Sequence, residues 1–123
     1  MKVVNNGMLQ AYIAGLADLM PQARAAGLPL ETVMRILAGG PAGLPMLADR
    51  IPKVLGEDMS VGFDIRSTFK DNRVFLDVLE SYGLTSPTLA RFRLQEGAVG
   101  KAGFWERDAA ALVSLAYYGV EDS

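Results

Sequence analysis

Residues 1–20, MKVVNNGMLQAYIAGLADLM, decide the fold of this chain. From Leu9 to Met20, apolar side chains recur at steps of four, three and four residues, which is the spacing of one face of an α-helix. Extended backwards at the same spacing, this face carries Asn6 and then Lys2. Because an unpaired ammonium is costly to bury, we expect this face to open onto a polar pocket at its N-terminal end.

The composition restricts the class of protein. With 123 residues, 50% of them apolar, the chain is long enough for one folded domain with one core. The net charge of −2 comes from 12 basic and 14 acidic residues that are well mixed, so no basic run predicts a nucleic acid or an anionic membrane as a partner. No signal peptide or membrane span is visible, and we expect a cytoplasmic protein.

The absence of Cys and His restricts the chemistry. It excludes disulfides, thiol nucleophiles, imidazole acid–base catalysis and the usual zinc ligand sets, and we predict no metal site. Any proton transfer must therefore fall to Lys, Tyr, Asp or Glu.

Apolar periodicity and Gly/Pro punctuation predict an all-α domain over residues 1–123, because no stretch alternates with period two for long enough to form a strand. Gly27 should end the first helix, with a kink or break near Pro21. Ser86-Pro87 is a strong start signal for another helix. The expected helices number about six: 2–26, 30–37, 44–54, 64–82, 86–99 and 105–118.

The fourth of these helices also combines apolar and charged residues on one face. Asp71 lies on its inner stripe, with Lys70 beside it; the apolar members of that stripe are Ile65, Phe69, Val74, Phe75, Val78, Leu79 and Tyr82. The residues alone leave two interpretations open. Lys2 could be solvated, Asn6 could cap its helix, and Lys70-Asp71 could be a solvent-exposed boundary, or these side chains could form a site.

Two motifs favour the site. The segment KVVNN, 2–6, resembles the K-x-x-N-N motif that opens the C-terminal helical domain of the β-hydroxyacid dehydrogenases, the 3-hydroxyisobutyrate dehydrogenase family, whose domain is like that of 6-phosphogluconate dehydrogenases. The segment FDIRSTFKD, 63–71, is similar to the family's F-x-x-x-x-x-x-K-D. A weaker match, GFWERDAAAL, 103–112, resembles the closing G-x-x-D-x-S-A-L, with extra residues before Asp108 and alanine in place of serine. The 6-phosphogluconate dehydrogenases have histidine where this chain has Asn5, which argues against that assignment.

The resemblance implies roles for individual residues. Lys2 would be the catalytic acid–base. The remaining positions would be Asn5, Asn6, Phe63 and Asp71 for the substrate, and Lys70 for the cofactor. We expect Lys2, Asn6, Phe63, Lys70 and Asp71 to converge on one pocket.

The resemblance also implies what is missing. NAD or NADP would be bound mainly by a Rossmann domain, and this chain has no G-x-G-x-x-G and no βαβ pattern. We therefore expect the C-terminal domain of a longer oxidoreductase acting on a small β-hydroxyacid, inactive and without cofactor on its own.

An alternative function is a non-catalytic helical module that mediates dimerisation or another interaction. Both interpretations predict a homodimer or a higher oligomer. The reason is that several apolar side chains of the first helix cannot all face one small core: Val3, Val4, Met8, Tyr12 and Met20.

Overall fold

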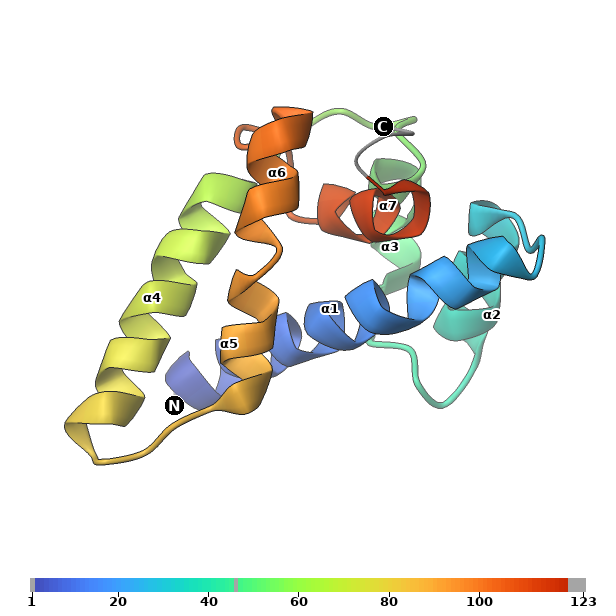
Figure 1. The fold of residues 1–123 in the computed structure, drawn as a ribbon. Helices are drawn as coiled ribbons and strands as arrows, with labels where there is room; N and C mark the ends of the chain where they lie inside the picture. The colour runs from blue at the N-terminus through green and yellow to red at the C-terminus, as the bar shows by residue number, and fades with distance from the viewer. Residues whose placement is uncertain (1, 46, 120–123) are drawn as a thin grey trace.

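The computed structural model describes residues 2–45 and 47–119, and within these residues the fold is all α-helical, as predicted (Figure 1). The only strand-like pairing found there is an isolated bridge between Asp64 and Asp108. None of the described helices is long and apolar enough to cross a membrane. The helices are α1 (Lys2–Ala25), α2 (Leu30–Gly39), α3 (Leu47–Val54), α4 (Ile65–Ser81), α5 (Pro87–Arg93), α6 (Glu96–Ala102) and α7 (Ala111–Tyr118).

The helix α1 is the central element of the fold. Figure 1 shows it running through the middle of the molecule, with α4 and α5 beside its N-terminal half and α2 near its C-terminal end. The helix α1 packs against α7, a short helix of mostly apolar residues. The buried core consists of two clusters of apolar side chains, described below. Because α1 and α7 both contribute to each cluster, they join the two ends of the domain.

The two clusters divide the core between the ends of α1. One lies at the C-terminal end and unites α1, α2, α3 and α7: Leu16, Met20, Leu30, Met34, Leu47, Ile51, Val54, Ala110, Val113 and Tyr117. The other unites α1 with α4, α5, α6 and α7: Ala14, Ile65, Phe69, Phe92, Val99, Ala111, Leu112 and Leu115. In the second cluster the rings of Phe69 and Phe92 stack with their centroids 4.8 Å apart.

Pro21 does not break α1, so the expected break is wrong, and the alternative, a kink at this position, stays a prediction. The helix continues to Ala25, and Gly27, with φ of +80°, follows its end as predicted. Proline removes one intrahelical hydrogen bond, but the buried face of α1 continues on both sides of it, with Met20 before and Ala23 after. The packing of these side chains offsets the missing bond.

The last two predicted helices differ most in their bounds, and the third begins at Leu47 rather than at Leu44. The expected helix 86–99 is two helices, α5 and α6, although Ser86 caps α5 as predicted and accepts a hydrogen bond from the backbone N–H of Leu89 at 3.1 Å. The expected helix 105–118 begins only at Ala111. The segment before Ala111 pairs instead with the chain leading into α4, where the N–H of Ile65 donates to the carbonyl of Arg107 at 2.9 Å.

The inner face of α4 is more polar than predicted. Val74 and Tyr82 were expected on it, but 49% and 77% of their surfaces are exposed. Their places in the interior are taken by Thr68 and by Asn72, which is fully buried. The start of α4 follows the usual rule, because Asp64 accepts a hydrogen bond from the N–H of Ser67 at 3.0 Å.

Candidate active site

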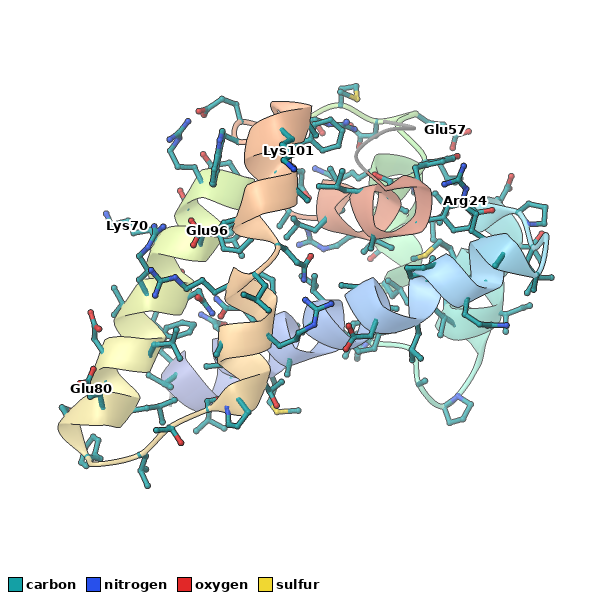
Figure 2. All side chains as sticks on the ribbon, in the orientation of Figure 1. Arg24, Glu57, Lys70, Glu80, Glu96 and Lys101 are labelled. Carbon is teal, nitrogen blue, oxygen red and sulfur yellow. The ribbon has the colours of Figure 1, made fainter. Side chains whose placement is uncertain are left out.

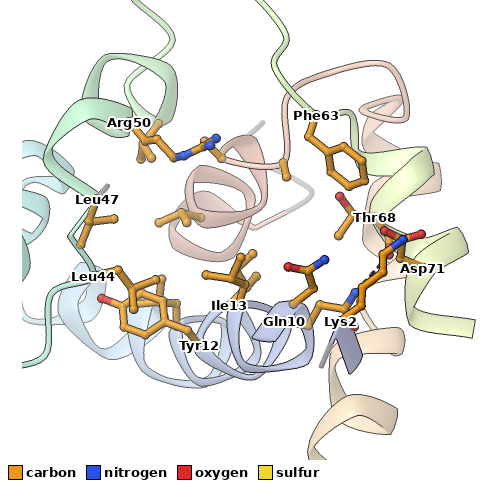
Figure 3. A pocket seen from close by; sticks show the side chains of 17 residues that line it. Lys2, Gln10, Tyr12, Ile13, Leu44, Leu47, Arg50, Phe63, Thr68 and Asp71 are labelled. Carbon is orange, nitrogen blue, oxygen red and sulfur yellow. Dashed lines mark hydrogen bonds between the residues drawn. The ribbon is translucent and has the colours of Figure 1, made fainter. Parts of the chain in front are cut away.

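A pocket of about 380 Å3 follows the face of α1 on which the sequence analysis placed Lys2 and Asn6 (Figure 3). A volume of this size is within the range of small-molecule sites, roughly 300–1,000 Å3. Most of the lining is apolar. The lining residues are Lys2, Asn6, Leu9, Gln10, Tyr12, Ile13, Leu16, Leu44, Leu47, Arg50, Val54, Phe63, Thr68, Asp71, Ala109, Ala110 and Val113.

One end of this pocket, which we call the Lys2 end, is formed by Lys2, Asn6, Phe63, Thr68 and Asp71. Lys2 and Asn6 come from the first turns of α1, and Thr68 and Asp71 from α4. Figure 3 shows the Lys2 side chain extended toward Asp71. Within the described part of the chain, neither of these two side chains makes an ion pair. The predicted pocket face of α1 is therefore present, and its charges are available to a ligand.

Two predicted site residues lie outside the pocket lining. Lys70 is exposed on the outer edge of α4 and points away from the domain (Figure 2), so the expected convergence does not include it. Consecutive residues of a helix are turned by about 100° from each other, which sends Lys70 outward when Asp71 faces the pocket. Asn5 is also exposed, and its amide donates to the Asn6 side-chain oxygen at 3.3 Å.

Two buried side-chain amides, Gln10 and Asn72, lie next to the Lys2 end. The Gln10 side chain donates to the carbonyl of Thr68 at 3.3 Å and accepts from the Asn72 side chain at 3.0 Å. Asn72 also donates to the carbonyl of Leu89 at 3.0 Å, so these bonds tie α1, α4 and α5 together. Sequence reasoning missed both amides. The available signal was their spacing, because Gln10 lies one turn after Asn6 and Asn72 one turn after Thr68.

A second polar group, which we call the Asp108 clamp, borders the pocket near α7. The buried carboxylate of Asp108 accepts hydrogen bonds from the N–H groups of Ala110 and Gly62 at 2.9 Å and of Phe63 at 3.3 Å. Burial would raise the pKa of Asp108, but these hydrogen bonds and the positive charge of Lys53 outweigh it and lower the pKa below its usual value. The clamp fixes the segment that carries Phe63 into the pocket.

Two cations of α3 face the Asp108 clamp, and only one of them lines the pocket. Lys53 lies 3.5 Å from the carboxylate and also donates to the carbonyl of Ser60 at 2.8 Å. Arg50 lies 3.6 Å from it, too far for a hydrogen bond, and its guanidinium points across the pocket in Figure 3. Sequence reasoning did not select Arg50, because a single arginine on a short helix has no distinguishing pattern.

The wall of the pocket opposite the Lys2 end contains a half-buried tyrosine, Tyr12, whose hydroxyl oxygen is buried. The Tyr12 hydroxyl has no hydrogen-bond partner among the residues that the structure describes, and its burial raises its pKa. Leu44 and Leu47 lie beside it in Figure 3. We call this part of the pocket, with Tyr12, Leu44, Leu47, Arg50 and Val54, the Arg50 end.

The arrangement can bind a small organic molecule and exchange a proton with it. Lys2 supplies an ammonium that can donate a proton, or an amine that can accept one, and Asn6 supplies both a hydrogen-bond donor and an acceptor. The apolar wall between the two ends would exclude water from the bound molecule and strengthen these polar contacts.

Comparison with known proteins agrees with the motifs. The family model described as "NAD-binding of NADP-dependent 3-hydroxyisobutyrate dehydrogenase" matches residues 1–116. The protein named Uncharacterized oxidoreductase YkwC, from Bacillus subtilis (strain 168), is 29% identical over 89 residues, which are 72% of this chain and 31% of that protein. The match thus spans about a third of the length of this relative. The resemblance drawn from the sequence motifs is confirmed.

Proposed function

This chain belongs to the NAD-binding family of NADP-dependent 3-hydroxyisobutyrate dehydrogenase, and we propose that it is the catalytic-lysine domain of an NAD(P)-dependent dehydrogenase. Its substrate in this proposal is a β-hydroxyacid such as 3-hydroxyisobutyrate. The observation that carries the proposal is the Lys2 end of the pocket, where the lysine and the asparagine of the K-x-x-N-N motif meet Asp71 and Phe63 beside an apolar wall.

In this proposal Lys2 is the acid–base of the reaction. During oxidation its amine accepts the proton of the substrate hydroxyl, and during reduction its ammonium returns that proton to the developing alkoxide. A cation at this position also stabilises the negative charge on the oxygen. Asn6 lies one turn along the same face of α1 and can hold the substrate by a hydrogen bond, while the neighbouring Asn5 holds the Asn6 side chain in place.

The cofactor would contact this chain only at its edge. Bound NAD or NADP supplies the hydride acceptor. On this chain the residue suited to hold it is Lys70, an exposed cation on α4 next to Asp71 and just outside the pocket, where it can meet an anionic group of a cofactor held by another domain. We therefore expect this chain alone to have little affinity for the cofactor.

The test of this function is a chimera in which the chain replaces the matching part of YkwC, assayed for NAD- and NADP-dependent oxidation of 3-hydroxyisobutyrate. Lys2→Ala should reduce kcat by roughly 10²–10⁴-fold, the usual contribution of a general acid–base. The matched control is Lys101→Ala, which removes an exposed lysine from α6, away from the pocket. If Lys2→Ala raises KM and leaves kcat unchanged, Lys2 only binds the substrate.

We also propose that the chain self-associates through α1. Val4 and Met8 lie one turn apart on this helix, and 61% and 66% of their surfaces are exposed. Neighbouring exposed apolar side chains favour a protein interface, and a symmetric dimer would cover them. Light scattering should give a mass near twice 13.2 kDa, and the double variant Val4→Asp, Met8→Glu should be monomeric. A monomeric parent chain at micromolar concentration would contradict this proposal.

A further inference from the structure

The Arg50 end of the pocket has a charge that the proposed reaction does not use. Arg50 is the charged residue of this end, and 36% of its side chain is exposed. Its neighbours in the lining are mainly apolar: Leu47 and Val54 come from the same helix, α3, and the ring of Tyr12, with its single hydroxyl, from α1. A guanidinium among apolar groups is well suited to bind a carboxylate in a bidentate manner.

The Asp108 clamp does not use up this guanidinium. The carboxylate of Asp108 already accepts three backbone hydrogen bonds, and Lys53 approaches it as closely as Arg50 does. Arg50 and Asp108 form an ion pair at 3.6 Å, and among the described residues no hydrogen bond accompanies it. The N–H donors of Arg50 are therefore free to bind an anion in the pocket, while the ion pair holds the side chain in position.

The two charged ends of the pocket are far apart. The lining residues of α1 run from Lys2 to Leu16, and at 1.5 Å of rise per residue this part of the helix is about 20 Å long. The wall between the two ends is apolar, with Leu9, Ile13 and Val113. A molecule as small as 3-hydroxyisobutyrate would fill only the Lys2 end. A longer ligand would reach Arg50 along a hydrocarbon chain.

We propose that Arg50 is a specificity-determining residue that binds a second, terminal carboxylate, so that the preferred ligands are acids with a carboxylate at each end of an aliphatic chain. The inference rests on the proposed function only in placing the hydroxyl of such a substrate at Lys2. The substrate class is then a hydroxyacid with a further acid group at its far end. The ligand's own hydrocarbon chain covers the apolar wall.

The test compares tetradecanedioate, whose extended chain is long enough to approach both ends of the pocket, with tetradecanoate, which has the same number of carbon atoms and one carboxylate fewer. Each is titrated into the chain while the backbone amide shifts of Ile13 and Val113 are followed by NMR. We expect tetradecanedioate to bind roughly five- to tenfold more tightly, the value of one charge-assisted contact. In Arg50→Gln this ratio should fall to about one, and Arg50→Lys should give an intermediate ratio because the fork is lost and the charge is kept.

The matched control is Lys53→Gln. Lys53 is the other cation of α3 beside Asp108, but it does not line the pocket, so its loss should leave the ratio unchanged. Three outcomes would overturn the inference: an unchanged ratio in Arg50→Gln, an equal fall in both variants, or no shift of the pocket amides with either acid. Because no turnover is measured, loss of the diacid preference and loss of hydride transfer in the chimera are separate results.

Discussion

The Lys2 end of the pocket and the Asp108 clamp that borders the pocket are two charged regions, and they differ in how far their charges are satisfied inside the domain. In the clamp, one buried carboxylate accepts three backbone hydrogen bonds and faces two cations. At the Lys2 end, Lys2 and Asp71 make no ion pair among the described residues, and Lys2 is exposed. Both regions carry a family motif, so the motif alone does not tell them apart.

This difference indicates which charges serve the fold and which serve a ligand. A buried charge is tolerated when its hydrogen bonds are complete, and then it has little left to offer a bound molecule. A charge at the edge of an apolar pocket without a partner in the domain stabilises little but remains available. Asp108 therefore serves the structure, whereas the proposals above give Lys2 to the reaction and Arg50 to both an ion pair of the fold and a ligand.

The largest expected effect is a difference in the free energy of unfolding between a variant of Asp108 and a variant of Asp71. Asp108→Ala leaves the N–H groups of Gly62, Phe63 and Ala110 without their acceptor and two cations without their partner, and it should lower the free energy of unfolding by about 3 kcal/mol. Asp71→Ala removes a carboxylate with no such bonds, and the change should be within about 0.5 kcal/mol. Urea unfolding followed by circular dichroism at neutral pH measures both values.

A result in the opposite direction would break the distinction between the two regions. If Asp71→Ala destabilises the chain as much as Asp108→Ala, the Lys2 end is part of the structural framework rather than an open site. The chimera provides the complementary measurement, since Asp71→Ala should impair substrate binding there while Asp108→Asn should act mainly through stability.

Most of the fold could be predicted from local signals in the sequence. Helix ends followed their caps at Asp64 and Ser86 and the glycine at Gly27, because capping acts within a few residues. The prediction was wrong where a long-range contact decides the structure. The chain before Ala111 is not helical, because Asp108 and the backbone around it bind the segment that enters α4, and no local pattern shows such a partner.

The candidate site was also predicted only in part. Lys2, Asn6, Phe63 and Asp71 were chosen from motifs, and all four line one pocket. Arg50 was not chosen, because a lone arginine carries no pattern until the packing of α3 places it. Gln10 was missed although it lies one turn after Asn6 on the same face of α1. The exposed position of Lys70 could have been expected from its place next to Asp71, since consecutive residues of a helix are turned by about 100° from each other.

A smaller effect is expected in the pH dependence of stability, because the contribution of Asp108 to the free energy of unfolding changes with pH. Burial would raise the pKa of Asp108, but the N–H groups of Ala110, Gly62 and Phe63 and the charge of Lys53 lower it overall. The folded state therefore binds a proton at Asp108 less readily than the unfolded chain does. The resulting stabilisation is fully present above the unfolded pKa, about 3.9, and is lost as the pH falls through the lower folded pKa.

The variant that isolates this contribution is Asp108→Asn, which keeps the size of the side chain and removes its titration. The difference in unfolding free energy between parent and variant should be largest near neutral pH and should narrow below about pH 4, by less than the loss in Asp108→Ala. Asp58 will keep some acid sensitivity in both proteins, because hydrogen bonds from the hydroxyl and N–H of Ser60 also lower its pKa. Urea unfolding at several pH values measures the difference. A difference that stays constant or grows as the pH falls would mean that the ionised form of Asp108 does not hold the clamp together.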